Sequence, residues 1–234
     1  TGRRPNLNFT LGAYDLSEAE ARVYEMFRNA DVHFPEEVIS GDVKLQLLRH
    51  VLQDVSVLTP EYVRERISER KDKKEQSGRD YSSIYTKLEK IFETHPEMRH
   101  LGEIQSSRYQ ALRNVLSNIP ADEEVVVFTD RKLGVVDKIE DILNEHYEAN
   151  STVRITGDEP TAIAPGRYFS DRELAMLRFQ ANPDARAMVA TQQTAGEGIR
   201  LDRARNIVLF ELPYTWDDIK QLIGRLQSPN QDRD

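Results

Sequence analysis

Helical and strand patterns alternate from residue 105 to the end of the chain, and this alternation limits the fold more than any other feature. β-branched or apolar runs of strand length stand at residues 123–129, 151–156, 186–191 and 206–211. Helical patterns accompany them at residues 106–119, 131–147, 170–179 and between Pro213 and Pro229. Strands that alternate with helices of this length predict a parallel sheet with helices on both faces and right-handed crossovers. Residues 105–234 are therefore expected to form an α/β domain.

The part of the chain before residue 105 is expected to be mainly helical. Ser17 followed three residues later by Glu20 is the capping-box pattern that begins a helix, and we expect this helix to reach about Ala30. A second helix is expected over residues 41–54, with a buried face made of Val43, Leu47, Leu48, Val51 and Leu52. Residues 1–104 are therefore expected to form a helical region in front of the α/β domain.

Residues 61–80 carry dense mixed charge and are expected to form a charged protrusion from the helical region. Dense mixed charge is typical of a solvated helix tip or a polar loop. A protrusion that contacts phosphate groups is the alternative interpretation. Helical patterning then returns at residues 82–92.

The composition excludes several classes of protein. The chain has 234 residues, a formal net charge of −8 and no cysteine, so disulfides, thiolate catalysis and cysteine-ligated metal sites are excluded. The net charge argues against a pervasive basic surface, although it allows a local basic groove. No apolar run reaches the roughly 20 residues that span a bilayer, and the N-terminus lacks the apolar core of a signal peptide. We expect an intracellular protein without a membrane partner, and the initial Thr suggests a fragment of a longer chain.

The last helix carries a polar stripe opposite its apolar face. The apolar side contains Ile219, Leu222, Ile223 and Leu226, and the opposite side contains Gln221, Gly224, Arg225 and Ser228. Ordinary solvent exposure explains most such stripes, but a glycine within an exposed helix costs about 1 kcal/mol relative to alanine. Gly224 therefore favours close approach by another body. The only tryptophan, Trp216, is expected to pack at the start of this helix.

A glycine-containing loop is predicted at residues 191–201, directly after the third strand. Ligands of parallel α/β sheets gather outside the carboxyl ends of the strands, and this loop leaves such an end. Because glycine has no side chain, Gly196 and Gly198 would let backbone amides approach a phosphate group. A plain turn without a ligand remains the alternative.

These segments, taken in order, resemble the second motor lobe of superfamily 2 helicases and translocases, in the Swi/Snf-like branch. VVVFTD resembles motif IV and VRITGD resembles the next strand. RAMVAT with TQQTAGEGIRL resembles motif V, and NIVLFELPY resembles the strand that leads from there to motif VI. IKQLIGRL resembles motif VI, and SDRELAMLRF is similar to the helix that precedes the motif V strand. The helical region is similar to the helices that open this lobe. The resemblance implies a RecA-like parallel sheet and covers most of the chain, most weakly at residues 55–100.

The resemblance implies that the last helix reaches the phosphates of ATP. Motif VI runs Gln-x-x-Gly-Arg-x-x-Arg in the family and is matched by Gln221, Gly224 and Arg225, whereas Ser228 stands at the second arginine position. Arg225 would be the arginine finger, with Gln221 beside it on the ATP phosphates. The missing charge leaves four alternatives open: Arg225 suffices, Arg233 or a partner replaces it, the motor is weak, or the residue was altered.

ATP and Mg²⁺ are expected to be bound mainly by another lobe. The chain has no phosphate loop of the form GxxxxGK[ST] and no acidic pair after an apolar strand. The chain alone is therefore expected to be inactive and to bind no metal through its own residues. Its expected contributions to the nucleotide site are Gly196, Glu197, Gly198 and Gly224; for Glu197 and Gly198 a plain turn is an equal alternative.

The resemblance also implies a DNA-binding track, with double-stranded DNA as the partner. The residues concerned lie at strand ends: Thr129, Thr156, Gly157, Thr191 and Gln192. Hydroxyl, amide and backbone N–H groups at such places bind phosphate oxygens without reading base sequence. Asp130 carries a charge that repels phosphate, so it is expected to cap the following helix instead.

The expected function is therefore the C-terminal lobe of an ATP-dependent DNA translocase, which works with an N-terminal RecA-like lobe of the same protein. One alternative is a non-catalytic RecA-like module that docks protein or nucleic acid, with Ser228 as the sign of lost activity. Another is an unrelated doubly wound domain that binds a small phosphorylated ligand. That domain would bind nucleotide tightly by itself, whereas a second motor lobe would bind it weakly.

Overall fold

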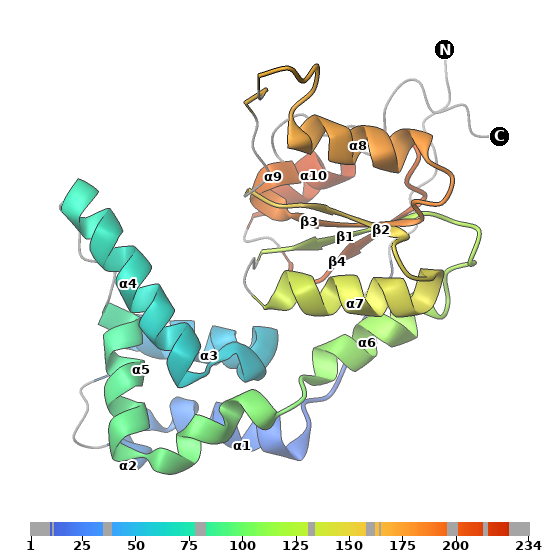
Figure 1. The fold of residues 1–234 in the computed structure, drawn as a ribbon. Helices are drawn as coiled ribbons and strands as arrows, with labels where there is room; N and C mark the ends of the chain where they lie inside the picture. The colour runs from blue at the N-terminus through green and yellow to red at the C-terminus, as the bar shows by residue number, and fades with distance from the viewer. Residues whose placement is uncertain are drawn as a thin grey trace. The chain divides into compact units, whose positions relative to one another are not determined.

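The computed structural model describes residues 10, 12–34, 39–77, 83–130, 134–157, 162–163, 165–195, 201–212 and 215–224. The chain divides into two compact units, each with its own core. The first, from Ala13 to Gln110, is helical, and the second is the α/β unit built on the residues from Ala111 onward (Figure 1).

The helical unit consists of short helices around one apolar core. Its elements are α1 (Glu18–Arg28), α2 (Ala30–His33), α3 (Gly41–Asp54), η1 (Val55–Val57), α4 (Pro60–Ser77), α5 (Ser83–Thr94), η2 (Pro96–Glu103) and the start of α6 (Ser107–Leu116). Phe27, Leu47, Leu88 and Ile91 are fully buried in this core. The capping box at Ser17 and Glu20 is present, as the sequence predicts.

The face of α3 is narrower than the sequence pattern predicts. Val43, Leu47 and Val51, which are spaced one turn apart, are buried, whereas the side chain of Leu52 is 37% exposed. The expectation that Leu52 is buried is wrong because the buried face of α3 is centred on Leu47, and Leu52, five residues further on, lies well away from Leu47 around the helix.

Glu20 joins the starts of two helices. Its carboxylate accepts hydrogen bonds from the backbone N–H of Ser17 (2.9 Å), at the start of α1, and from the backbone N–H (3.1 Å) and hydroxyl group (2.5 Å) of Ser107, at the start of α6. Glu20 is fully buried. Burial alone would raise the pKa of Glu20, but the hydrogen bonds from Ser107 and Ser17 together lower it.

Replacing Glu20 with Gln is expected to lower the free energy of unfolding by about 1–3 kcal/mol at pH 7, because the amide group faces buried donors that need an acceptor. A lowered folded-state pKa means that the contribution of the carboxylate is fully present above the unfolded-state pKa and is lost as the pH falls through the folded-state pKa. Urea unfolding of wild type and variant at several pH values measures this difference. A gap between the two proteins that stays constant in acid would contradict the assignment.

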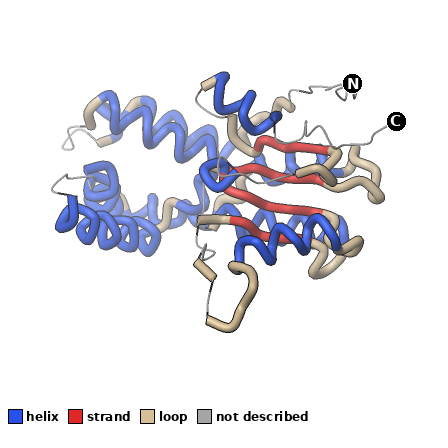
Figure 2. Tube along the Cα trace, turned by 90° about the horizontal axis from the view of Figure 1, so that it is seen from above, coloured by secondary structure: helices blue, strands red, loops and turns tan. Residues whose placement is uncertain are grey.

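The α/β unit is a four-stranded parallel sheet with helices on both faces. Its strands are β1 (Val125–Thr129), β2 (Thr152–Ile155), β3 (Ala187–Thr191) and β4 (Asn206–Leu209), in the spatial order β2-β3-β1-β4. Its helices, after the end of α6, are α7 (Val135–Tyr147), α8 (Asp171–Ala181), α9 (Gln192–Ala195) and α10 (Trp216–Gly224). The expected fold class, a RecA-like parallel sheet preceded by a helical region, is confirmed (Figure 2).

The order of the strands explains why helices cover both faces. The chain moves across the sheet in one direction from β1 to β2 and in the opposite direction from β2 to β3. Because parallel crossovers are right-handed, these two moves place their helices on opposite faces. In Figure 1, α7 lies on one face and α8 on the other.

The core of the α/β unit lies against the two central strands. Every residue of β1 and β3 is buried. Phe179 of α8 is fully buried with Phe128 and Ile155 of the sheet.

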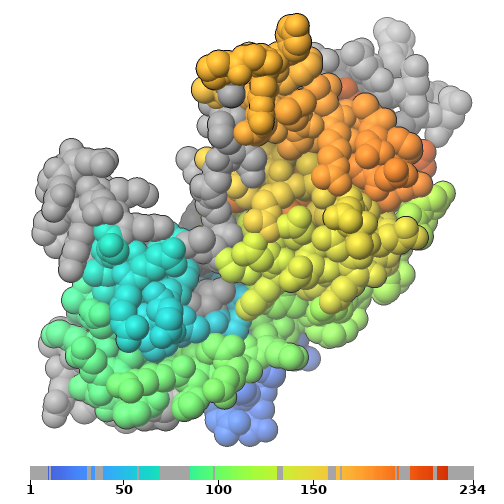
Figure 3. Space-filling model, in the orientation of Figure 1, coloured from blue at the N-terminus to red at the C-terminus, as the bar shows by residue number. Residues whose placement is uncertain are grey.

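The outer side of α8 and the segment before it form part of the surface (Figure 3). This surface carries exposed apolar side chains at Ile163, Tyr168, Phe169, Leu174 and Leu177.

Replacing Glu148 with Gly is expected to raise the free energy of unfolding by about 1 kcal/mol, since a non-glycine residue in a sparsely populated backbone region costs roughly 1–3 kcal/mol. Glu148 follows α7 with φ of 98° and ψ of 155°. Its backbone hydrogen bonds, to Asn144 and Ser151, do not depend on the side chain. Urea unfolding measures the gain.

The control for this substitution is Asn150→Gly. Asn150 has φ of 67°, in the left-handed region that asparagine tolerates, so its replacement should bring a smaller gain. Equal gains at the two positions, or a loss of stability for Glu148→Gly, would contradict the account of strain.

Candidate functional site

Three threonines lie side by side at the carboxyl edge of the sheet. Thr129 at the end of β1 pairs with Thr191 at the end of β3. Ile155 of β2 pairs with Ala190, the residue before Thr191. Thr156 therefore lies beside Thr191, on the side of β3 that faces away from β1. All three threonines are buried. The structure therefore brings together the strand-end residues that the sequence assigned to DNA, but their side chains face inward.

Glu211 connects the ends of three chain segments at this edge. Its carboxylate oxygens accept one hydrogen bond from the hydroxyl group of Thr129 (3.2 Å) and one from the backbone N–H of Asp130 (2.9 Å). Its backbone carbonyl accepts a hydrogen bond from the side-chain amide of Gln192 (2.9 Å). Glu211 is 5% exposed. The segment after β4 is thus held to the end of β1 and to the start of α9.

The N-cap of α7 is Gly134, and no side chain donates or accepts a capping hydrogen bond there. The expectation that Asp130 caps this helix is therefore wrong. The helix begins five residues after Asp130, beyond the position from which a capping side chain acts, and the backbone N–H of Asp130 binds Glu211 instead.

The predicted loop at residues 191–201 begins as a helical turn. The four residues of α9 follow β3 without a break. The hydroxyl groups of Thr191 and Thr194 are 2.6 Å apart, and the guanidinium of Arg172 donates a hydrogen bond to the carbonyl oxygen of Thr194 (2.7 Å). Arg172 is 9% exposed, so a buried cation holds the end of α9. This arrangement replaces the loop that the glycines suggested for residues 191–195.

The last helix begins at a capping residue. The hydroxyl group of Thr215 accepts a hydrogen bond from the backbone N–H of Asp218 (3.1 Å). Trp216 is 61% exposed, so the expectation that it packs at the start of α10 is wrong. The first turn presents Trp216 and two aspartates to solvent, because the apolar period of this helix begins only at Ile219.

Several expected site residues lie outside the part of the chain that the structure describes. Gln221 and Gly224 belong to α10, but nothing is described of their side-chain environment. The remaining residues of the expected nucleotide site, Gly196, Glu197, Gly198 and Arg225, lie outside the described ranges, as do Ser228 and Arg233. Their assignments remain predictions.

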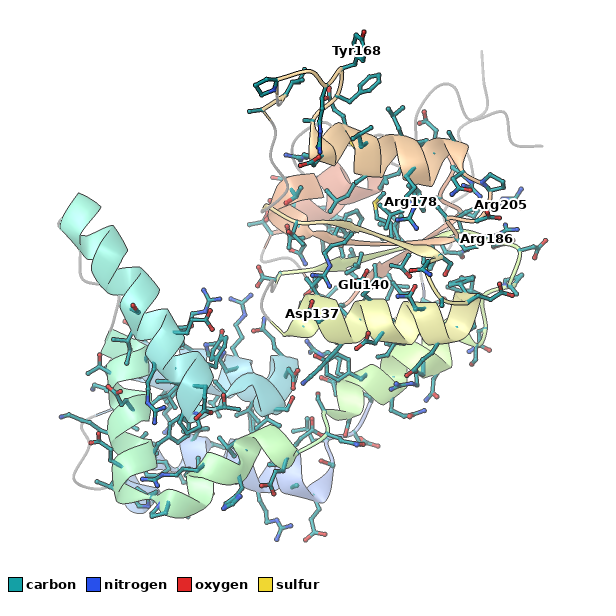
Figure 4. All side chains as sticks on the ribbon, in the orientation of Figure 1. Asp137, Glu140, Tyr168, Arg178, Arg186 and Arg205 are labelled. Carbon is teal, nitrogen blue, oxygen red and sulfur yellow. The ribbon has the colours of Figure 1, made fainter. Side chains whose placement is uncertain are left out.

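The amino edge of the sheet is closed by ion pairs. The carboxylate of Glu124 lies 3.0 Å from the guanidinium of Arg203 and 3.5 Å from that of Arg186. Burial first, and then the charges of Glu123 and Glu124, raise the pKa of Tyr147 to about 12. In Figure 4, Arg178, Arg186 and Arg205 lie at this end of the unit. At the amino edge, charged side chains are thus paired with side chains of opposite charge, whereas the carboxyl edge is rich in hydroxyl groups.

Among the described residues, no group of three or more His, Asp or Glu side chains is placed to hold a metal ion. Within the same ranges, no helix is both long and apolar enough to cross a membrane.

Sequence reasoning missed Glu211, Arg172 and Thr194 as parts of the carboxyl edge. The available signal was an acidic residue at the end of an apolar strand pattern and an arginine in the first turn of a helix. Neither pattern shows which distant residue it binds, since Glu211 and Thr129 are 82 residues apart in the chain.

Comparison with known proteins gives one family and two similar structures. Residues 107–229, more than half of the chain, match the family model described as helicase conserved C-terminal domain. The comparison with curated proteins gave no match. The solved C-terminal part of the Fun30 ATPase domain is similar with a TM-score of 0.62 and 15% identity, covering 94% of this chain and 79% of that chain. The Sulfolobus solfataricus SWI2/SNF2 ATPase C-terminal domain matches with a TM-score of 0.43 and 15% identity, covering 84% of this chain and 68% of that chain.

Proposed function

Because the chain belongs to the helicase conserved C-terminal domain family, we propose that it is the C-terminal lobe of an ATP-dependent DNA translocase. The membership confirms the resemblance to the second motor lobe of superfamily 2 proteins. The observation that carries the proposal is the extent of the match, since residues 107–229 include the segments that resemble motifs IV, V and VI. The chain shares its fold with the C-terminal part of the Fun30 ATPase domain, which supports the Swi/Snf-like assignment.

In this proposal the lobe contributes to a nucleotide site that forms only when two lobes close. Arg225 and Gln221 reach the phosphates of ATP, and the backbone at Gly196, Glu197, Gly198 and Gly224 lies near the nucleotide. A permanently charged planar guanidinium suits the charge that spreads over a transferred phosphoryl group. The first lobe holds ATP and Mg²⁺, because this chain has neither a phosphate loop nor an acidic magnesium motif.

DNA is proposed to lie along the carboxyl edge of the sheet. Gly157 is exposed there, whereas Thr129, Thr156 and Thr191 are buried. Direct contact with a phosphate is therefore proposed for the backbone at Gly157, while the threonines and Gln192 fix the strand ends that present it. Contacts of this kind hold a strand without reading its sequence, as a motor that steps along DNA requires.

The proposal is tested by ATP hydrolysis of the complete protein, measured as phosphate release with no DNA, with a single strand and with a duplex. We expect duplex DNA to increase the rate and the chain alone to hydrolyse no ATP. The rival is a non-catalytic docking module, which Ser228 at the second arginine position of motif VI favours. A rate of ATP hydrolysis that DNA does not change, or no hydrolysis at all, would support the rival.

A nucleotide titration of the 234-residue chain distinguishes the proposed motor lobe from the third possibility, an unrelated doubly wound domain. A domain that binds a small phosphorylated ligand by itself should bind ATP tightly. The proposed second lobe should bind it weakly, because most phosphate contacts belong to the first lobe.

A further inference from the structure

Glu211 lies in the segment NIVLFELPY, between the loop that resembles motif V and the helix that resembles motif VI, and no role was assigned to it from the sequence. It lies two residues after β4, where the backbone N–H of Phe210 still binds the carbonyl oxygen of Phe128 (2.8 Å) and continues the pairing of β4 with β1. The side chain of Glu211 then binds the next two residues of the β1 segment, Thr129 and Asp130. The two segments are thus joined at three successive positions.

Both oxygens of the Glu211 carboxylate are used. One accepts from the hydroxyl group of Thr129 and the other from the backbone N–H of Asp130. Glutamine has the same size but replaces one acceptor oxygen with an amide donor. Glu211→Gln therefore keeps an acceptor for only one of these two donors: the amide oxygen can accept from the backbone N–H of Asp130, whereas the hydrogen bond with Thr129 must reverse or break, and no cavity opens.

The third link goes to the segment after β3. The side-chain amide of Gln192, the first residue of α9, donates to the backbone carbonyl of Glu211, and the far end of α9 is held by Arg172. Four residues after Glu211, Thr215 caps α10, the helix that leads to Arg225. One buried residue therefore links the ends of β1 and β3, which lie at the edge where DNA is proposed to bind, with the segment that leads to Arg225.

We propose that Glu211 is the positioning residue that couples DNA contact to ATP hydrolysis. A displacement of the β1 end or of α9 by bound DNA is transmitted through its hydrogen bonds to the segment that enters α10. The inference rests on the proposed function, because it requires DNA at the carboxyl edge and ATP near Arg225. Glu211 itself touches neither ligand and acts through the segments it holds.

A matched control exists at the opposite edge of the sheet. Glu124 is also a buried carboxylate, 8% exposed, and it holds Arg203 and Arg186 at the amino edge. Glu124→Gln removes a comparable buried interaction, so it should also destabilise the fold. It touches none of the segments at the carboxyl edge, and it should leave the coupling intact.

The experiment compares wild type, Glu211→Gln and Glu124→Gln in the complete protein. The quantities are the ratio of ATP hydrolysis rates with and without saturating duplex DNA, the affinity for a labelled duplex, and the melting temperature. For Glu211→Gln we expect the ratio to fall by about 10- to 100-fold, the size of effect that a misplacement of about 1 Å has on catalysis. Duplex affinity should change little, since many phosphate contacts share it. For Glu124→Gln the ratio should equal that of wild type.

Three outcomes decide the matter. An equal ratio for wild type and Glu211→Gln overturns the inference and leaves the proposed function standing. The same fall for both variants shows a structural role and also overturns it. A wild-type protein without DNA-stimulated hydrolysis overturns the proposed function and the inference with it.

Thr129→Val keeps the test decisive if Glu211→Gln fails to fold. This substitution removes only the hydroxyl donor at nearly constant volume, and it leaves the link from Asp130 in place. The ratio of rates for Thr129→Val should lie below that of wild type and above that of Glu211→Gln. A ratio equal to that of wild type would overturn the inference.

Discussion

Replacing Arg225 with Ala in the complete protein is expected to slow DNA-stimulated ATP hydrolysis by about 10³- to 10⁵-fold, the contribution of an arginine finger. Arg225 directly follows α10 and matches the arginine of motif VI that is retained in this chain. With Ser228 at the second arginine position, no other motif VI arginine can share the role. Acid-quenched single-turnover hydrolysis measures the loss, because it reports the chemical step before the products are released.

Arg225→Lys is the matched control for this substitution. Lysine keeps the positive charge but lacks the planar fork that binds two phosphate oxygens, so only part of the rate should return. Ser228→Arg, which restores the second arginine, should leave the rate unchanged or raise it. A rate for Arg225→Ala equal to that of wild type would show that the finger comes from elsewhere or that the lobe is not catalytic.

The largest effect on stability is expected for Phe179→Ala. Phe179 is fully buried between α8 and the sheet, where it belongs to one apolar cluster with Phe128 and Ile155. Removing a buried phenylalanine side chain costs about 3–5 kcal/mol through lost burial and the cavity that remains. Urea unfolding of the 234-residue chain measures this cost.

Tyr168→Ala is the control, since Tyr168 precedes α8 and is 89% exposed (Figure 4). Its replacement should change the free energy of unfolding by no more than about 0.5 kcal/mol, as is usual for surface substitutions. If Phe179→Ala lowered the free energy of unfolding as little as Tyr168→Ala, this would contradict the burial of Phe179 between α8 and the sheet.

The elements that the sequence predicted correctly are those whose signals are local. The capping boxes at Ser17 and Ser170 lie within one helical turn, and both are present. The strand patterns at residues 123–129 and 186–191 are mainly apolar runs that begin with charged residues, and they contain the buried central strands β1 (Val125–Thr129) and β3 (Ala187–Thr191). Their alternation with helices was sufficient to predict the parallel sheet, because few connections between parallel strands are possible.

The errors concern residues whose environment depends on distant parts of the chain. Asp130 does not cap α7, because this helix begins only at Val135 with Gly134 as its N-cap, and the backbone N–H of Asp130 binds Glu211, which is 81 residues away. The start of the predicted loop is helical, because Arg172 and Gln192 hold α9 at both ends. Such contacts follow from the register of the sheet, which the order of elements does not specify. The same reason explains why Glu211 was not predicted as part of the site.

The most direct test of the central claim is translocation itself, measured as displacement of a third strand from a DNA triplex by the complete protein. The account predicts displacement that requires ATP and that disappears in Arg225→Ala. Intact triplex in the presence of ATP, under conditions where the protein binds the duplex, would contradict it.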